Sequence, residues 1–178
     1  MSKFEDAAKR AEAAVRGSAE EANRLKRADL DLAASLVVEL RSQLVEFVNY
    51  VSRQIPLRAY KVPSTRMFKE KSPVGVIVNM STDTYYVPPR PTGFSMVTSD
   101  GRLWSSGRDA GYADTSASAL VANRIYIPRL GTVEVRDGEL IVRSAYADSG
   151  DPLHEGIAAL AANLLSTPYE GSYAAIFG

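Results

Sequence analysis

The spacing of apolar residues predicts that the first third of the chain is helical. Between residues 32 and 55, large apolar side chains recur at steps of three and four, the pattern of a helix with one continuous buried stripe. The stripe consists of Leu36, Leu40, Leu44, Phe47, Val48, Val51 and Ile55. Val37, Val38 and Val45 widen it, which favours packing against a sheet or several neighbours. Pro56 then ends the helix, because a residue before proline disfavours the α conformation.

Residues 2–31 predict a more polar helix in front of this one. Apolar residues fall near heptad spacing at Phe4, Ala8, Ala11, Val15, Ala22 and Leu25. Most of them are alanines, which bury little area, so this segment should be helical by propensity and weakly packed. Gly17 and Ser18 interrupt the pattern and predict a kink or a helix end. Ser18 would then cap a second segment, with Glu21 completing a capping box.

Residues 73–144 alternate in the manner of β-strands. The β-branched and aromatic runs 73–80 and 82–89 are separated by polar residues around 81–83, which predicts a hairpin turn there. A further short strand is expected at 124–128, and 115–123 predicts a short helix. With two more hairpins, the region holds six or seven short strands, mostly antiparallel, as in a small sheet or sandwich.

Two Asp-Gly pairs predict tight hairpins, because both residues tolerate positive φ. A two-residue loop at 137–138 pairs Val135 with Leu140 and Val133 with Val142. A similar loop at 100–101 places Val97 opposite Trp104. For each hairpin the sequence therefore predicts the strand register as well as the position of the turn. These two pairs are the most specific local signals in the sequence.

Residues 151–166 predict the last helix, with Asp151 as N-cap and Pro152 at the first helical position. Its apolar stripe is Leu153, Ile157, Leu160 and Leu164. The tail, residues 167–178, ends on Ile176 and Phe177, which we expect to be buried against another surface.

The predicted fold is therefore α+β, with a helical extension at 1–31 and one domain at 32–178. The domain comprises the core helix at 32–55, a basic linker at 57–72, the strands at 73–144 and the C-terminal helix packed on the sheet. A length of 178 residues suits one ordinary core plus an extension.

Composition restricts the function classes. The 21 basic and 21 acidic residues cancel, so no overall field draws the chain to nucleic acid or to a membrane. The absence of cysteine excludes disulfides and thiolate metal sites and fits a reducing compartment. The charged beginning has no signal-peptide pattern, and no apolar run reaches membrane-spanning length. We expect a cytoplasmic protein, or one inside an assembled particle.

The residues that carry chemistry are few. His154 is the only histidine and has no nucleophile at a spacing that indicates catalysis, so an ordinary helical histidine is the simpler interpretation. The acidic residues show no calcium-loop spacing. We therefore expect no enzyme activity, no metal and no cofactor.

Two stretches indicate an alternative function, in which the protein binds an anion or a nucleotide. The loop 105–118 combines glycines with Arg108, Ser105 and Ser106, which suit a phosphate or carboxylate, although it contains no nucleotide-binding motif. The strip 57–72 has five bases and one acid, including Arg58, Lys61, Arg66 and Lys69. Both compositions are also typical of a surface loop and a solvated linker.

The helical pattern favours a structural protein over a binder. We expect an assembly protein that docks through its N-terminal helix onto copies of itself or onto other subunits, of which a phage or virion component is one instance. The expected partner contacts are Phe4, Ala8, Ala11, Val15, Ile176 and Phe177.

Overall fold

The structure is a computed structural model. It describes residues 3–55, 58–59, 73–83, 90–106, 110–144 and 150–166, and for residues 3–11, 13, 58–59, 80–83 and 90–92 it describes the backbone alone. The helices are α1 (Lys3–Val51), α2 (Ala117–Val121) and α3 (Leu153–Ser166). The strands are β1 (Arg58–Ala59), β2 (Val74–Asp83), β3 (Arg90–Thr98), β4 (Leu103–Ser105), β5 (Gly111–Tyr112), β6 (Tyr126–Ile127), β7 (Gly131–Arg136), β8 (Glu139–Arg143) and β9 (Asp151–Pro152).

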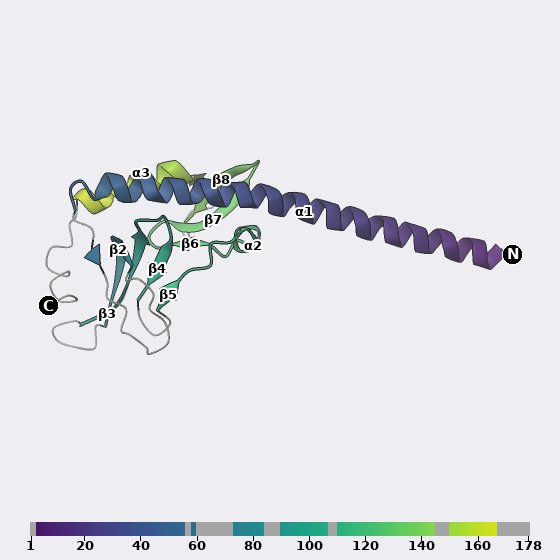
Figure 1. Cartoon of the computed structure of the whole chain (residues 1–178), viewed down its shortest axis with the longest axis horizontal. Coiled ribbons are helices and arrows are strands. Elements are labelled where there is room, and N and C mark those ends of the chain that lie inside the picture. The colour runs from purple at the N-terminus through teal and green to yellow at the C-terminus, as the bar shows by residue number, and fades with distance from the viewer. Residues whose placement is uncertain are drawn as a thin grey trace.

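The predicted α+β class is confirmed, with the strands divided between two antiparallel sheets. One sheet has the order β1-β2-β3-β4-β5 and the other β6-β7-β8-β9, so each strand pairs with its neighbour in sequence. The described residues form nine strands, more than the six or seven expected. The difference arises because four of the nine strands are only two residues long. α1 runs along both sheets, and its N-terminal part projects far beyond them (Figure 1).

α1 is one unbroken helix of 49 residues without a sharp kink (Figure 1), so the predicted kink or helix end at Gly17 and Ser18 is wrong. The Ser18 hydroxyl donates a hydrogen bond of 2.9 Å to the carbonyl of Val15, a bond made within a helix and not at a cap. An exposed glycine costs a helix only about 1 kcal/mol, and the Ala, Glu, Lys and Arg around it are strong helix formers. Local propensity therefore carries the helix through this position.

The predicted apolar stripe of α1 is buried. Leu40, Leu44 and Val48 are each about 1% exposed. Backbone bonds continue past the helix to Ile55, whose amide donates to the carbonyl of Val51. The expected widening of the stripe holds only on one side, because Val37 is partly buried against the core whereas Val38 is 70% exposed.

The first hairpin differs from its prediction. β2 continues through Ser81, Thr82 and Asp83, where a turn was expected, and pairs along its length with β3. Asp83 lies opposite Arg90, so the connection falls at 84–89, outside the described residues. The polar residues at 81–83 therefore extend a strand, because partner strand β3 supplies hydrogen bonds that the local sequence does not reveal.

The β3–β4 hairpin also corrects a predicted register. Val97 lies opposite Leu103, and Trp104 lies opposite Met96. The cause is a three-residue loop, Ser99 to Gly101, in which the Gly101 amide donates to the carbonyl of Thr98 and Gly101 has a φ of +75°. A turn closed by a glycine in the left-handed region shifts the pairing by one residue from that of a two-residue loop.

The second sheet follows its predicted register. Val135 pairs with Leu140 and Val133 with Val142, across a turn whose residues Asp137 and Gly138 have φ values of 53° and 82°. The expected short helix is α2, capped by Ser116, whose side chain accepts a bond from the Ala119 amide.

The last helix begins at Leu153, one residue later than predicted. Asp151 and Pro152 instead form β9 and pair with β8, so the expected capping role of Asp151 is replaced by strand pairing. The predicted stripe of α3 is buried at Leu153, Ile157, Leu160 and Leu164, and Ala161 joins it.

The main core joins all three helices to both sheets. It combines the stripes of α1 and α3 with Leu120 of α2, Val97 of the first sheet and Val133 of the second. A smaller cluster lies on the other face of the first sheet and consists of Ile77, Phe94, Met96 and Trp104, with Tyr112 against it. The second half of α1 is thus the element that both sheets share.

Candidate interaction surface

The N-terminal part of α1 projects from the domain as an arm, defined here as residues 3–32. Every described side chain from Glu12 to Asp29 is exposed, Leu30 is partly buried, and Ala33 is the first of the described side chains to be fully buried. The arm nevertheless holds large apolar side chains: Val15 is 68% exposed, Leu25 54% and Leu32 45%. An exposed apolar residue on its own is ordinary. These three residues are notable because they lie on the same face of the helix.

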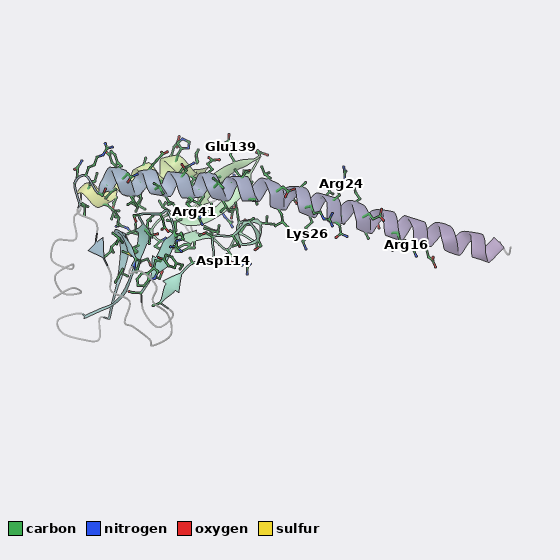
Figure 2. The ribbon with its side chains drawn as sticks, viewed as in Figure 1. Arg16, Arg24, Lys26, Arg41, Asp114 and Glu139 are labelled. Carbon is green, nitrogen blue, oxygen red and sulfur yellow. The ribbon has the colours of Figure 1, made fainter. Side chains whose placement is uncertain are left out.

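The apolar side chains of the arm lie on the same face of α1 as the buried stripe. Val15, Ala22, Leu25 and Leu32 follow one another at steps of seven, three and seven, and Leu36 continues the series into the core. Figure 2 shows Lys26 pointing toward the side where the sheets lie and Arg24 pointing away from it. We call this ridge of the arm, on the domain side, the arm face.

The arm face leads into a hollow where α1 meets the domain. Its volume is about 290 Å³, and it is lined by Asp29, Leu32, Ala33, Leu120, Val121, Asn123 and Val135. Val121 of α2 is 48% exposed beside Leu32, so the apolar surface passes from the arm onto the domain. The hollow does not follow from the sequence, because residues of three separate elements, α1, α2 and β7, form its walls.

The outer side of the arm is polar. Arg24 donates to both carboxylate oxygens of Glu21, at 2.6 and 2.9 Å, and this hydrogen bonding raises the pKa of the arginine above its ordinary value. Both side chains are largely exposed, so the ion pair contributes little to stability. It supports the solubility of the face opposite the apolar ridge.

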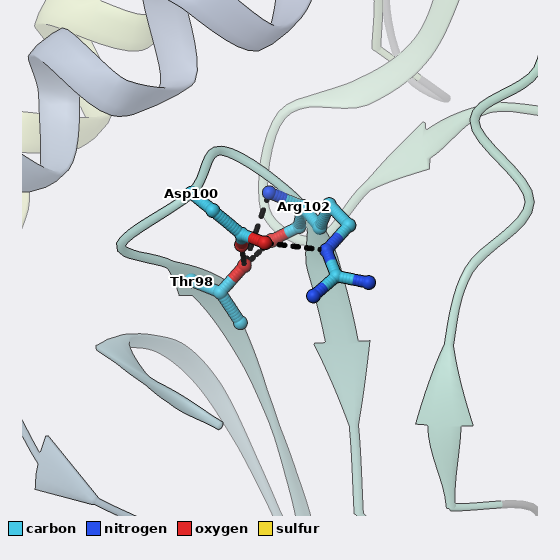
Figure 3. A network of polar contacts seen from close by, with 3 residues as sticks. All are labelled: Thr98, Asp100 and Arg102. Atoms are coloured by element: carbon cyan, nitrogen blue, oxygen red, sulfur yellow. Dashed lines mark hydrogen bonds and ion pairs between the residues drawn. The ribbon is translucent and has the colours of Figure 1, made fainter. Parts of the chain in front are cut away.

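A polar network joins residues of the β3–β4 hairpin, which lies against the second half of α1. Thr98 donates to Asp100 at 2.6 Å, and Arg102 donates to the other carboxylate oxygen of Asp100 at 2.7 Å (Figure 3). Partial burial raises the pKa of the Asp100 carboxyl, but these bonds and the Arg102 charge outweigh it, so its pKa is lowered overall. The Arg102 guanidinium also lies 3.7 Å from the ring centre of Tyr112. This network is explained by the fold and needs no ligand.

The residues predicted for anion binding are only partly described. Arg108, Lys61, Arg66 and Lys69 lie outside the described residues, and Arg58 is described as backbone of β1 only. Ser105 and Ser106 lie at the end of β4 and serve strand pairing. The Ser106 hydroxyl accepts the Phe94 amide at 2.8 Å, and the Ser105 hydroxyl shares a 3.2 Å bond with Ser95.

The predicted partner contacts are divided in the same way. Val15 is exposed on the arm face. Phe4, Ala8 and Ala11 belong to the helical backbone of the arm, but their side chains are not among those described. Ile176 and Phe177 lie outside the described residues.

A second hollow, of about 300 Å³, lies between α1 and α3. Its lining is mainly apolar and consists of Gln43, Glu46, Phe47, Tyr50, His154, Ile157, Ala158, Ala161 and Ala162. His154 lies exposed at the edge of this hollow. The hollow is open because the α3 residues that face α1 include alanines, whose side chains are small. The sequence did not reveal this hollow, because each wall belongs to a different helix.

Within the described part of the chain, His, Cys, Asp and Glu nowhere gather in a group of three or more that suits a metal ion. No described helix has the length and apolar character needed to cross a membrane. Comparison with protein-family models, curated proteins and solved structures gives no match for this chain.

Proposed function

We propose that this chain is a non-enzymatic assembly protein that binds a copy of itself, or another subunit of a larger particle, through the arm face. The observation that supports the proposal is the continuity of the arm face with the buried stripe of α1. One face of a single helix is covered by the domain from Ala33 onward, partly buried at Leu30, and exposed at every described side chain from Glu12 to Asp29.

The physical reason is that exposed apolar side chains at heptad spacing gain free energy when another helix covers them. Burying a leucine or valine side chain contributes about 1.5–3 kcal/mol. A seam of such residues with small alanines between them permits close approach of a second helix. The arm has these features without a partner among the described residues of its own chain.

The test compares two single substitutions that add the same charge, one on the arm face and one away from it. Leu25→Glu places a carboxylate on the arm face, whereas Gly17→Glu places one away from that face, where no atom lies within 4 Å of an added Cβ. Sedimentation velocity should show an assembled parent, an assembled Gly17 variant and a dissociated Leu25 variant. A monomeric parent at high concentration would contradict binding to a copy of itself, and assembly that Leu25→Glu leaves intact would contradict the role of the arm face.

Arg108→Ala serves as the control for the alternative of anion binding. It should leave assembly unchanged, because Arg108 is not on the arm. A thermal shift of the parent with inorganic phosphate that is lost in this variant would support the alternative, since a charge-assisted contact contributes about 1.5–3 kcal/mol.

A further inference from the structure

We infer that the arm pairs with the arm of a second copy of this chain in an antiparallel two-helix arrangement, with Val15 of one copy opposite Leu25 of the other. The inference rests on the proposed function and names the partner and the geometry of the contact. Three properties of the arm lead to it: which face is apolar, where the domain begins on that face, and where its charges fall.

The start of the domain excludes a parallel pair. Two parallel helices in contact along the arm face would continue side by side beyond Leu32. From Ala33 onward, that same face of each helix is already covered by its own α2 and sheets, which form one core with it. The two domains would therefore occupy the same space. In an antiparallel pair each domain lies at the opposite end, and the described side chains from Val15 to Asp29, which are all exposed, are free to pair.

The charge on the arm face leads to the same orientation. Asp29 lies on the ridge between Leu25 and Leu32. A parallel homodimer places each ridge residue against itself, so two Asp29 carboxylates would meet in the seam, which is unfavourable. The antiparallel pair places Asp29 opposite position 11, an alanine, and no like charges meet within the ridge.

The register is the one that places the large apolar residues of the two copies opposite each other and oppositely charged residues at the flanking positions. With Val15 opposite Leu25, Ser18 lies opposite Ala22, so the small residues meet at the centre of the pair. The flanking positions on one side then bring Glu12 of one copy next to Lys26 of the other, twice by symmetry, and on the other side the two Glu21 residues meet, each paired with Arg24 of its own chain. A register one heptad shorter would place Val15 against Ser18 and would separate the two large side chains.

The test uses the absence of native cysteine. Val15→Cys and Leu25→Cys chains with tags of different mass are mixed and oxidised, with Arg24→Cys on the outer side as control. The expected product is a disulfide between the Val15 and Leu25 variants, at least ten-fold more abundant than either homodimer. Disulfide-linked homodimers of each variant would overturn the inference in favour of a parallel pair, and equal cross-linking of the Arg24 control would overturn it as random collision.

A charge exchange provides a second readout without cysteine. Lys26→Glu should weaken the dimer roughly ten-fold, since two attractive contacts become repulsive. Adding Glu12→Lys in the same chain should restore the parent affinity, and failure to restore it would overturn the register. Sedimentation of the untreated parent separates the two failures. An assembled parent without the expected cross-link overturns only this geometry, whereas a monomeric parent also overturns the self-association in the proposed function.

Discussion

Gly101, at the tip of the β3–β4 hairpin, lies directly against the backbone carbonyl of Arg41 in α1. A Cβ added at Gly101 would contact that carbonyl oxygen and would lie 2.8 Å from Cγ of Arg41. This close approach joins the first sheet to the middle of α1, and it requires a glycine both for space and for its φ of +75°.

Gly101→Ala should therefore destabilise the domain more than the same change at Gly138. Both glycines have positive φ, but no atom lies within 4 Å of a Cβ at Gly138. The Gly138 variant should lose about 1–2 kcal/mol from backbone strain, and the Gly101 variant about 1–3 kcal/mol more from displacement of the hairpin. Urea unfolding of both variants measures the difference. Equal losses would show that the contact with α1 is unimportant for stability.

Leu40→Asp should abolish most of the stability of the domain. Leu40 is about 1% exposed in the core shared by both sheets, so the substitution leaves an unpaired carboxylate there, at a cost of several kcal/mol. Val38→Asp is the matched control, because Val38 is on the same helix and 70% exposed. Its melting temperature should remain within a few degrees of the parent, about 4 °C at most. A tolerated Leu40→Asp would contradict the assignment of the buried stripe.

Deletion of residues 1–31 should leave the domain folded. No described side chain between Glu12 and Asp29 is buried, so the deletion removes little of the core. The truncated chain should unfold cooperatively, within about 4 °C of the parent measured under conditions where the parent is dissociated. Loss of the cooperative transition would mean that the arm belongs to the folding unit.

Asp100→Asn should reduce stability at neutral pH but not in acid. The Asp100 pKa is lowered in the folded state, so the carboxylate contributes stability above its unfolded pKa, and this is lost as the pH falls through the folded pKa. The carboxylate is about half exposed, so the neutral-pH difference should be below about 1 kcal/mol. Thermal melts of both proteins from neutral pH to about 3 should converge on the acid side. A gap that widens in acid would contradict the proposed stabilisation.

The periodic parts of the chain could be predicted from sequence because their signals are local. Apolar residues at steps of three and four identify the stripes of α1 and α3, and the Asp137-Gly138 turn determines its own register through two positive φ values. The arm face also follows from sequence, since heptad spacing defines one side of a helix wherever that helix forms.

Features that depend on contacts between residues far apart in the chain were determined only by the tertiary structure. β2 continues through its predicted turn because β3 pairs with it, and Val37 is partly buried while Val38 is exposed because the domain covers one side of α1. The hollow beside Leu32 exists only where α1, α2 and β7 meet. Sequence periodicity states that a face is apolar, but whether that face is covered depends on contacts between residues far apart in the chain. Only the fold establishes that full burial begins at Ala33 and that the described side chains of the arm from Glu12 to Asp29 are exposed.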